Sequence, residues 1–402
     1  MYFQTLDDKT ECVGVYKDGE LYFDDFPDNL LRTWKYSGSI TDDNVEYAWL
    51  YAEGQTLRDA CPPEYEKELN SSMRKMEAFF KSFQIAKLNM NEHCIFDLIP
   101  EDSLAAFCEI KNKITEYVFT NYSKPNNYVF LNEAQKLLYS IRETNLNIDI
   151  SDCKSLFTST NNRLGLQKIT NGPKYIDYNL FGTVTGRLTT YPRSFPILTM
   201  KRDFRRIIKP HNDWFLSLDY NGAEVRTVLA LLGKTQPSED IHNWNVANIF
   251  NSSEYTQQEI PFDRDDAKVL FFGWLYNPDS EVIKSTLYDR DAIIDQYYID
   301  GSVSTIFGRN IEVDKRRALS YIVQSTTSDL VLDRAIAISK LLEGKSSFVS
   351  HLVHDEVVID LHDEDKHLVP EIKDIFSNNK LDNFLVNLSA GKNFYDLEEL
   401  KL

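Results

Sequence analysis

The sequence predicts an α+β fold, in which an antiparallel sheet and long helices follow a smaller α/β region. Three observations support this prediction. Trp214–Leu218 is a mostly apolar run suited to a buried strand, and from Glu224 the apolar residues recur at helical spacing. Phe348–Leu361 has two apolar arms around a polar tip, as in a β-hairpin. Residues 314–343 keep a helical pattern throughout.

The composition is that of a globular protein. With 402 residues, 42% of them hydrophobic and 13% aromatic, the chain is long enough for two or three domains and is not disordered. No run approaches about 18 apolar residues, so we expect an intracellular protein without a membrane segment. The net charge of −18 argues against wholesale wrapping of nucleic acid. The five cysteines match no zinc or redox pattern and are interpreted as reduced structural thiols.

Residues 1–150 contain strand patterns followed by helix patterns. Residues 11–24 alternate around Asp18-Gly19 and predict a hairpin, and Val45–Tyr51 predicts a further strand. Asp18-Gly19-Glu20 also has the Asp-x-Glu spacing of a metal-dependent exonuclease, but the turn already explains this spacing and is favoured. Amphipathic helices are predicted at Glu64–Lys87, Glu101–Val118 and Asn132–Arg142.

An acid stands at the end of the first buried strand. Asp219 follows Trp214–Leu218 and precedes the probable turn residues Asn221 and Gly222. A carboxylate at this lip is well placed to hold a metal ion, because its burial costs free energy unless a partner offsets the charge. An Asp that caps the following helix is an equal alternative at this point.

A basic segment stands out in this acidic chain. Between residues 187 and 209 the cations face a single acid, Asp203. We favour a strip that contacts phosphates over a solvated basic face. The cations are Arg187, Arg193, Lys201, Arg202, Arg205, Arg206 and Lys209.

A helix is predicted over Asp265–Tyr276. Two cations and then two aromatics recur there every four residues, so they share one face of the helix. Cations suit a triphosphate, and aromatics suit stacking on a base. The alternative is an amphipathic helix whose basic end is solvated. The four residues are Arg264, Lys268, Phe272 and Tyr276.

A second acidic group lies at the tip of the predicted hairpin, in His354-Asp355-Glu356. Another His-Asp-Glu, His362–Glu364, lacks a second apolar arm and is interpreted as a solvated loop. Gly301–Asn310 predicts a strand and turn before the long helix. That helix carries Arg316, Gln324 and Asp329.

In this order, the segments from Thr185 to the C-terminus resemble the family A DNA polymerases, which include bacterial DNA polymerase I and related phage enzymes. Five motifs in compatible order make this a strong signal. Thr185-Gly186-Arg187-Leu188 is similar to the family's TGRL segment, Asp219–Arg226 to motif A, the spacing from Arg264 to Tyr276 to the fingers helix, Gln324–Asp329 to QGTAAD, and His354-Asp355-Glu356 to motif C.

The resemblance implies a right-hand polymerase with an antiparallel-sheet palm and helical fingers. The thumb should be reduced, since few residues separate Asp152 from Arg187. The first region shows no convincing set of exonuclease carboxylates, so it is either a degenerate exonuclease-like domain or unrelated. The expected domains are 1–150 (N-terminal α/β and helical region), 151–225 (reduced thumb and first part of the palm), 226–300 (fingers) and 301–402 (second part of the palm).

The resemblance also implies a two-metal-ion nucleotidyl transfer. Two Mg²⁺ ions, or Mn²⁺ in their place, would bind Asp219, the Tyr220 carbonyl and Asp355. Glu356 would support them, and Lys268 would complete the catalytic group. Five residues would bind the dNTP: Arg264, Lys268, Phe272, Tyr276 and Glu224, with Glu224 excluding a 2′-hydroxyl. The primer and template would contact Arg187, Arg205, Arg206, Arg316, Gln324 and His354.

The expected function is that of a template-directed DNA polymerase that extends a primer 3′ end in phage DNA replication, without its own 3′–5′ exonuclease. It would act on primer-template DNA and dNTPs in the cytoplasm, which is the host's if a phage encodes it. A short thumb and an acidic charge predict a processivity factor or a separate exonuclease subunit as partner. The alternatives are a catalytically inactive DNA-binding subunit of polymerase fold, a repair or gap-filling polymerase, and an RNA-synthesising relative.

Overall fold

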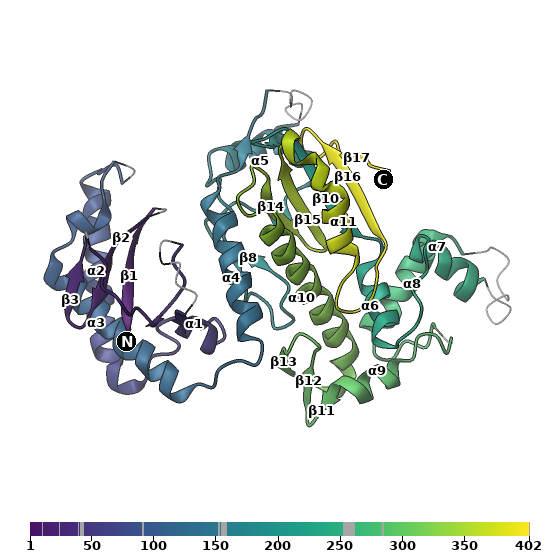
Figure 1. The fold of residues 1–402 in the computed structure, drawn as a ribbon, viewed down its shortest axis with the longest axis horizontal. Coiled ribbons are helices and arrows are strands. Elements are labelled where there is room, and N and C mark those ends of the chain that lie inside the picture. The colour runs from purple at the N-terminus through teal and green to yellow at the C-terminus, as the bar shows by residue number, and fades with distance from the viewer. Residues whose placement is uncertain are drawn as a thin grey trace. The chain divides into compact units, whose positions relative to one another are not determined.

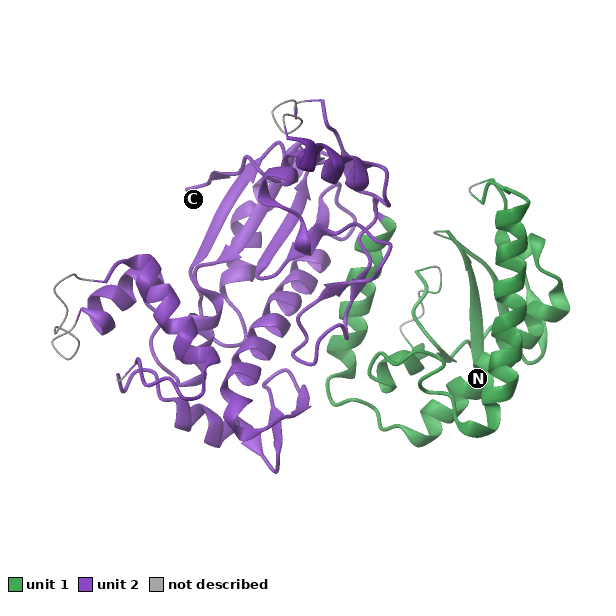
Figure 2. Cartoon of the chain, turned by 180° about the vertical axis from the view of Figure 1, so that it is seen from behind, with its two compact units in different colours: residues 1–143 green, residues 144–402 purple. Residues whose placement is uncertain are grey.

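The chain forms two compact units, residues 1–143 and residues 144–402 (Figure 2). The structure is a computed structural model. It describes residues 1–9, 11–23, 25–38, 40, 44–90, 92–151, 153, 159–251, 262–283 and 285–401. Asp24, which ends the predicted hairpin, and Asp152, from which the predicted short thumb was measured, lie outside these residues. Among the described helices, none is both long and apolar enough to cross a membrane.

The first unit contains an antiparallel sheet with the strand order β1-β2-β3. Asp18 and Gly19 join β2 to β3 with positive φ angles of 52° and 92°, which a two-residue hairpin turn of type I′ requires. The predicted hairpin is therefore confirmed, and the Asp-x-Glu spacing belongs to its turn. The strands are β1 (Phe3–Asp8), β2 (Glu11–Lys17) and β3 (Glu20–Tyr22).

Helices make up most of the rest of this unit, and the three long ones that the periodicity predicted are present within a few residues. The strand predicted at Val45–Tyr51 is wrong except at β5 (Glu46–Tyr47), which pairs in parallel with β4 (Arg32–Thr33). The remainder is a helical turn whose four residues are all buried, and a short apolar run cannot distinguish the two structures. The helices are α1 (Ala48–Tyr51), α2 (Pro63–Ile85), the 3-10 helix η1 (Ile95–Leu98), α3 (Glu101–Asn121) and α4 (Tyr128–Glu143).

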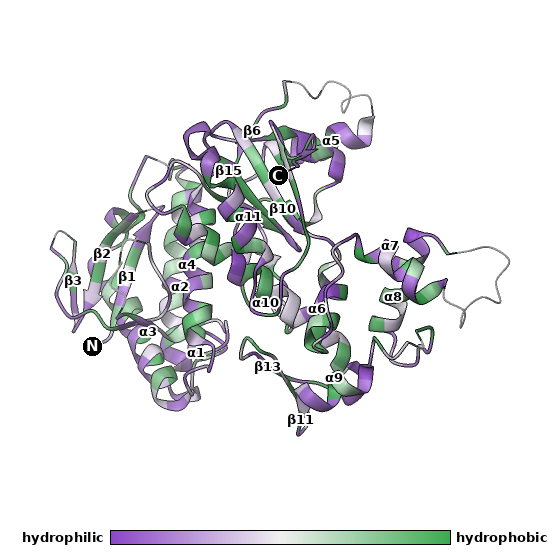
Figure 3. Cartoon of the chain, turned by 45° about the vertical axis from the view of Figure 1, so that its right-hand side comes forward, coloured by the Kyte–Doolittle hydropathy of each residue, from purple (hydrophilic) through white to green (hydrophobic). Residues whose placement is uncertain are grey.

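The second unit is built on a five-stranded antiparallel sheet with the order β14-β15-β10-β16-β17 (Figure 1). β10 lies at its centre, and the central strands β10 and β15 are mostly buried and apolar (Figure 3). The hairpin predicted at Phe348–Leu361 is confirmed. The strands are β10 (Trp214–Tyr220), β14 (Phe348–Val353), β15 (Glu356–Leu361), β16 (Val386–Gly391) and β17 (Glu398–Glu399).

One long helix, α10 (Ala318–Leu341), connects this sheet with a group of helices (Figure 1). It contacts β14 and β15 as well as α6, α8 and α9. The predicted helix over residues 314–343 begins instead as the 3-10 turn η6 (Lys315–Arg317), with Asp314 as its cap. The helices of the group are α6 (Ala223–Leu231), α7 (Ile241–Asn245), the π-helix η5 (Val246–Phe250), α8 (Arg264–Tyr276) and α9 (Arg290–Tyr297).

Shorter elements complete this unit. His362 caps the 3-10 helix η7 (Asp363–Leu368), so the loop predicted at His362–Glu364 is wrong in detail. Among the described residues between 144 and 187, α5 (Thr160–Thr170) is the only helix. The others are β6 (Asn147–Ile148), β7 (Tyr178–Asn179), β8 (Thr189–Thr190), η3 (Ile197–Thr199), η4 (Arg202–Ile207), β9 (Ile208–Lys209), β11 (Tyr298–Ile299), β12 (Ser302–Ser304), β13 (Asn310–Glu312) and α11 (Val369–Ser377).

Candidate active site

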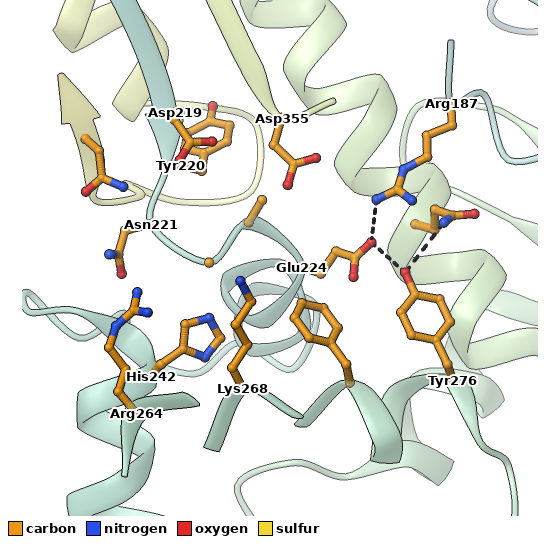
Figure 4. A pocket seen from close by; sticks show the side chains of 15 residues that line it. Arg187, Asp219, Tyr220, Asn221, Glu224, His242, Arg264, Lys268, Tyr276 and Asp355 are labelled. Carbon is orange, nitrogen blue, oxygen red and sulfur yellow. Dashed lines mark hydrogen bonds and ion pairs between the residues drawn. The ribbon is translucent and has the colours of Figure 1, made fainter. Parts of the chain in front are cut away.

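A pocket of about 600 Å³ lies between the ends of the sheet strands and the helix α8 (Figure 4). Ten of the residues predicted for the site line it: Arg187, Asp219, Tyr220, Glu224, Arg264, Lys268, Phe272, Tyr276, Gln324 and Asp355. The other lining residues, for which the sequence predicted no binding or catalytic role, are Asn221, Gly222, Ala223, His242 and Asn387.

The strand register brings the two predicted metal-binding acids to one edge of the sheet. Asp219 on β10 pairs with Glu356 on the antiparallel strand β15. Asp355 directly precedes Glu356 in the two-residue turn of the β14–β15 hairpin. Paired residues of antiparallel strands lie about 5 Å apart at Cα, so Asp355, the neighbour of Glu356, lies close to Asp219. The carboxyl groups of Asp219 and Asp355 both line the same pocket (Figure 4).

The chemistry of these acids fits a divalent cation. Burial, together with the nearby charges of Asp355 and Glu356, raises the pKa of Asp219 to about 7. Burial also raises the pKa of Asp355, while Arg187 and His354 lower it. The pocket therefore holds like charges that a bound cation would offset. Carboxylate and carbonyl oxygens are the ligands that Mg²⁺ and Mn²⁺ prefer.

The described residues contain no cluster of three or more His, Cys, Asp or Glu side chains arranged to hold a metal ion. The predicted ligands at this pocket are the carboxylates of Asp219 and Asp355 and the Tyr220 carbonyl, and all three residues line it. Magnesium commonly binds one or two protein carboxylates and completes its shell with water and substrate phosphates. The donor set is therefore sufficient for a site that is completed by a bound phosphate group.

Glu356 is close to the pocket but does not line it. Its Oε1 accepts a hydrogen bond from the Ser217 hydroxyl at 2.6 Å, and its Oε2 lies 3.8 Å from the guanidinium of Arg205. Arg205 also lies 4.6 Å over the ring of Phe394. Arg205, predicted to bind DNA, thus lies against an acid of the site and an aromatic ring.

Helix α8 supplies the opposite wall of the pocket. It begins with a capping box, in which the carboxylates of Asp263 and Asp266 each accept a hydrogen bond from the other's backbone N–H. This start places the four-residue repeat along the pocket (Figure 4). Arg264 and Lys268 face the acids, and the rings of Phe272 and Tyr276 stack with their centroids 6.2 Å apart.

Glu224 joins the remaining motifs at one end of the pocket (Figure 4). It is 5% exposed, accepts a hydrogen bond from the Tyr276 hydroxyl at 2.7 Å, and lies 3.2 Å from the Arg187 guanidinium. Gln324 in turn accepts a hydrogen bond at 2.8 Å from the hydroxyl of Thr185. These contacts connect the TGRL-like segment, motif A, the fingers-like helix and α10 around one buried carboxylate.

Steric constraints explain why residue 186, directly before Arg187, is a glycine. Gly186 has a φ of +77°, and an added Cβ would collide with the Arg309 guanidinium. That guanidinium cannot easily move, because it pairs at 2.7 Å with the fully buried Asp329. Glycine at this position therefore lets Arg187 reach the pocket.

Four predicted DNA-contacting residues do not line this pocket: Arg205, which lies against Glu356, and His354, Arg316 and Arg206. His354 has a φ of +56° and lines a small cavity beside Arg187. Arg316 lines a second pocket of about 860 Å³ and pairs with the exposed Asp279 at 2.7 Å. Arg206 pairs at 3.3 Å with Asp396 and lies 4.4 Å over the ring of Tyr395.

Two of the residues that sequence reasoning missed have specific positions. Asn387 on β16 pairs with Asp219 and donates a side-chain hydrogen bond to its carboxyl group. No spacing could have located it, because only the sheet brings β16 beside β10. His242 is 3% exposed, and burial with the neighbouring charge of Arg264 lowers its pKa to about 4. The cap residue Asp240 before it was a usable signal for a helix start.

Comparisons with known proteins find DNA polymerases among the similar sequences and structures. No family model matches the chain. DNA polymerase I of Synechocystis sp. (strain ATCC 27184 / PCC 6803 / Kazusa) is 24% identical in an alignment of length 277, and the match covers 52% of this chain and 28% of that protein. The thermostable DNA polymerase I of Thermus aquaticus is 25% identical in an alignment of length 235, and the match covers 47% of this chain and 28% of that protein. Each match thus spans less than a third of the relative's length.

A solved structure extends this likeness to the fold. The POL domain of Pol1 from M. smegmatis, in complex with DNA primer-template and dNTP, aligns with a TM-score of 0.67 and 12% sequence identity. The alignment covers 98% of this chain and 95% of that one. At this identity the structural match concerns the fold. Together with the two sequence relatives, it confirms the resemblance that the motifs indicated.

Proposed function

We propose that this chain, a relative of the family A DNA polymerases, is a template-directed DNA polymerase that adds deoxynucleotides to a primer 3′ end. One observation carries the proposal. Asp219 and Asp355 at the sheet edge face Arg264 and Lys268 of α8 across a single pocket (Figure 4). Acids on one side and cations on the other suit a metal-bound triphosphate.

Asp219, Asp355 and the Tyr220 carbonyl would hold two divalent ions, Mg²⁺ or alternatively Mn²⁺. When bound, such ions lower the pKa of an attacking hydroxyl and stabilise charge on the transferred and leaving oxygens. Arg264 and Lys268 would bind the triphosphate and offset the charge that develops on the leaving group. Glu356, fixed by Ser217, would support the acids from behind.

The aromatic end of the pocket would select the nucleotide. Phe272 and Tyr276 offer a stacked pair against the sugar and base. Glu224, held by Tyr276 and Arg187, would fill the space of a 2′-hydroxyl, which favours DNA synthesis over RNA synthesis. Arg187, Arg205, Arg206, Arg316, Gln324 and His354 would contact primer and template.

In this proposal the five-stranded sheet is the palm and the helices within residues 226–300 are the fingers. Residues 151–225 would hold the reduced thumb and the first part of the palm; α5 is the only helix among the described residues between 144 and 187, which is consistent with a short thumb. Residues 301–402 would complete the palm. The region 1–150 would lack exonuclease activity, so a processivity factor or a separate exonuclease subunit would assist the enzyme in phage DNA replication. A repair or gap-filling role remains the alternative.

Primer extension by the purified chain with Mg²⁺ tests the proposal. We expect dNTP incorporation that Asp355→Asn abolishes, while Glu364→Gln in the second His-Asp-Glu leaves it unchanged. DNA binding without incorporation by the wild-type protein would favour the inactive subunit instead. Processive copying of long templates by the purified chain at moderate salt would contradict the need for a partner.

A further inference from the structure

We propose that Asp240 is a positioning residue that fixes Arg264 and His242 at the proposed nucleotide pocket. Asp240 does not line the pocket, whereas Arg264, His242 and Asn221 do. Each of these three residues is tied to Asp240 by a hydrogen bond. The inference rests on the proposed function, since it concerns the residues that would bind the triphosphate.

Five hydrogen bonds converge on this one carboxylate. Oδ1 accepts from the backbone N–H groups of His242 and Asn243 at 3.1 and 2.9 Å, so Asp240 is the N-cap of α7. Arg264 donates to both oxygens, from Nε at 3.1 Å and from a terminal nitrogen at 2.9 Å. Asn221 donates to Oδ2 at 2.8 Å. Asp240 thus connects the turn after β10 with the starts of α7 and α8.

The segment that carries Asp240 is itself anchored. The fully buried Arg226 donates hydrogen bonds to the backbone carbonyls of Asn221, Pro237 and Glu239 at 2.7 to 2.8 Å. Asn221 also accepts one from the backbone N–H of Ile241 at 2.9 Å. With its own backbone held on both sides, the carboxylate stays in place and determines where the Arg264 side chain lies.

The pairing leaves part of Arg264 available to a ligand. A guanidinium has five N–H donors, and Asp240 takes only those on one edge. The remaining terminal nitrogen lies 3.9 Å from Asp265, which is too long for a hydrogen bond, and Asp265 is 90% exposed. The side chain of Arg264 is 45% exposed and lines the pocket. An anion in the pocket can therefore bind the free edge without displacing Asp240.

The hydrogen bonds that Asp240 accepts favour its charged form. Burial alone would raise its pKa, but the hydrogen bonds from Arg264, Asn221 and Asn243 hold the pKa well below its usual range. Asp240 could instead compete with phosphate for Arg264. The two roles predict opposite changes in phosphate affinity when the charge of Asp240 is removed. Removing a competitor would tighten phosphate binding, whereas removing a positioning group would weaken it.

Asp240→Asn distinguishes these roles, because Asn caps a helix as well as Asp does but lacks the charge and the second acceptor oxygen. The probe is inorganic tripolyphosphate, with binding measured by calorimetry, followed by the KM for dNTP. We expect tripolyphosphate affinity to fall and KM to rise by about tenfold, with kcat and DNA affinity changed by less than about threefold. Asp265→Asn, beside the same arginine, is the matched control and should change none of these.

A double-mutant cycle separates positioning from general damage. Because Asn keeps the cap of α7 that holds His242, Asp240→Asn should affect the pocket through Arg264, and adding it to Arg264→Ala should cause no further loss of affinity. An additional loss would overturn the proposal, as would unchanged or tighter binding by Asp240→Asn alone. If Asp240→Asn does not fold, Arg264→Lys keeps the charge without the bidentate contact and should give the same weakening; affinity equal to the wild type would then overturn the proposal.

The wild-type protein distinguishes this inference from the proposed function. Tripolyphosphate binding without dNTP incorporation would reject the polymerase and leave the role of Asp240 intact. No tripolyphosphate binding by the wild-type protein would overturn the role of Asp240, whatever the polymerase activity.

Discussion

The Tyr276 hydroxyl donates a hydrogen bond of 2.7 Å to the carboxylate of Glu224. The two residues lie at the end of α8 and the start of α6, and the bond joins two walls of the pocket (Figure 4). Burial raises the pKa of Glu224, while Tyr276 and Arg187 lower it. A buried, doubly held carboxylate has one position, so it can act as a fixed steric limit.

We expect Glu224→Ala to weaken discrimination against ribonucleotides. The smaller side chain opens space where a 2′-hydroxyl would lie, so the ratio of kcat/KM for dNTP to that for rNTP should fall by about 10²-fold or more. Single-nucleotide incorporation kinetics measure this ratio. Glu343→Ala, an exposed change at the end of α10, is the control. An unchanged ratio in Glu224→Ala would remove Glu224 from sugar selection.

Metal binding should stabilise the protein as well as activate it. If Mg²⁺ binds as proposed, it would offset the repulsion between Asp219 and Asp355, so its addition should raise the melting temperature of the wild-type protein by mass action. Chelation should abolish incorporation, and restored Mg²⁺ should recover it. Asp219→Asn removes a ligand and should lose both the thermal shift and the activity. A shift of equal size in Asp219→Asn would place the metal elsewhere.

The neighbouring arginines Arg205 and Arg206 should behave differently. Arg206 pairs with the exposed Asp396 and lies over the ring of Tyr395, so Arg206→Ala should weaken DNA binding uniformly and reduce the salt slope by about one. Arg205 lies against Glu356, so Arg205→Ala should lower kcat more than DNA affinity. Salt-dependent DNA binding and primer extension measure the two effects. Identical losses for both variants would contradict this division.

Acid should destabilise the protein through His351. This residue is fully buried between the rings of Phe215 and Phe394, and burial with the charge of Arg205 lowers its pKa to about 3. Because the folded pKa lies below the unfolded value of about 6.5, its contribution to stability is present above pH 6.5 and is lost as the pH falls toward 3.

His351→Phe removes this titration and should flatten the fall in unfolding free energy between pH 6.5 and 4, an effect on the order of a few kcal/mol. Denaturant unfolding at several pH values measures it. His367→Gln, at an exposed position, serves as the control. Parallel stability curves for wild type and His351→Phe would show that His351 is not the titrating group.

Local patterns in the sequence determined much of this protein. The spacing of Arg264, Lys268, Phe272 and Tyr276 predicted a helix face, and that face lines the pocket. The apolar arms of the hairpin predicted the turn that carries Asp355. These predictions succeed because helix and strand periods are short-range properties of the chain. The strand predicted at Val45–Tyr51 failed for the same reason, since a short apolar run fits either structure.

Only the tertiary structure decided which distant residues meet. Asn387 lies beside Asp219 because β16 pairs with β10, and no spacing in the chain encodes that pairing. Asp240 contacts Arg264 because Arg226 holds its segment by backbone carbonyls, which a sequence does not display. Arg205 was predicted from its charge alone, but packing placed it against Glu356. The sequence specifies which groups are available, while sheet register and burial determine which of them come within bonding distance.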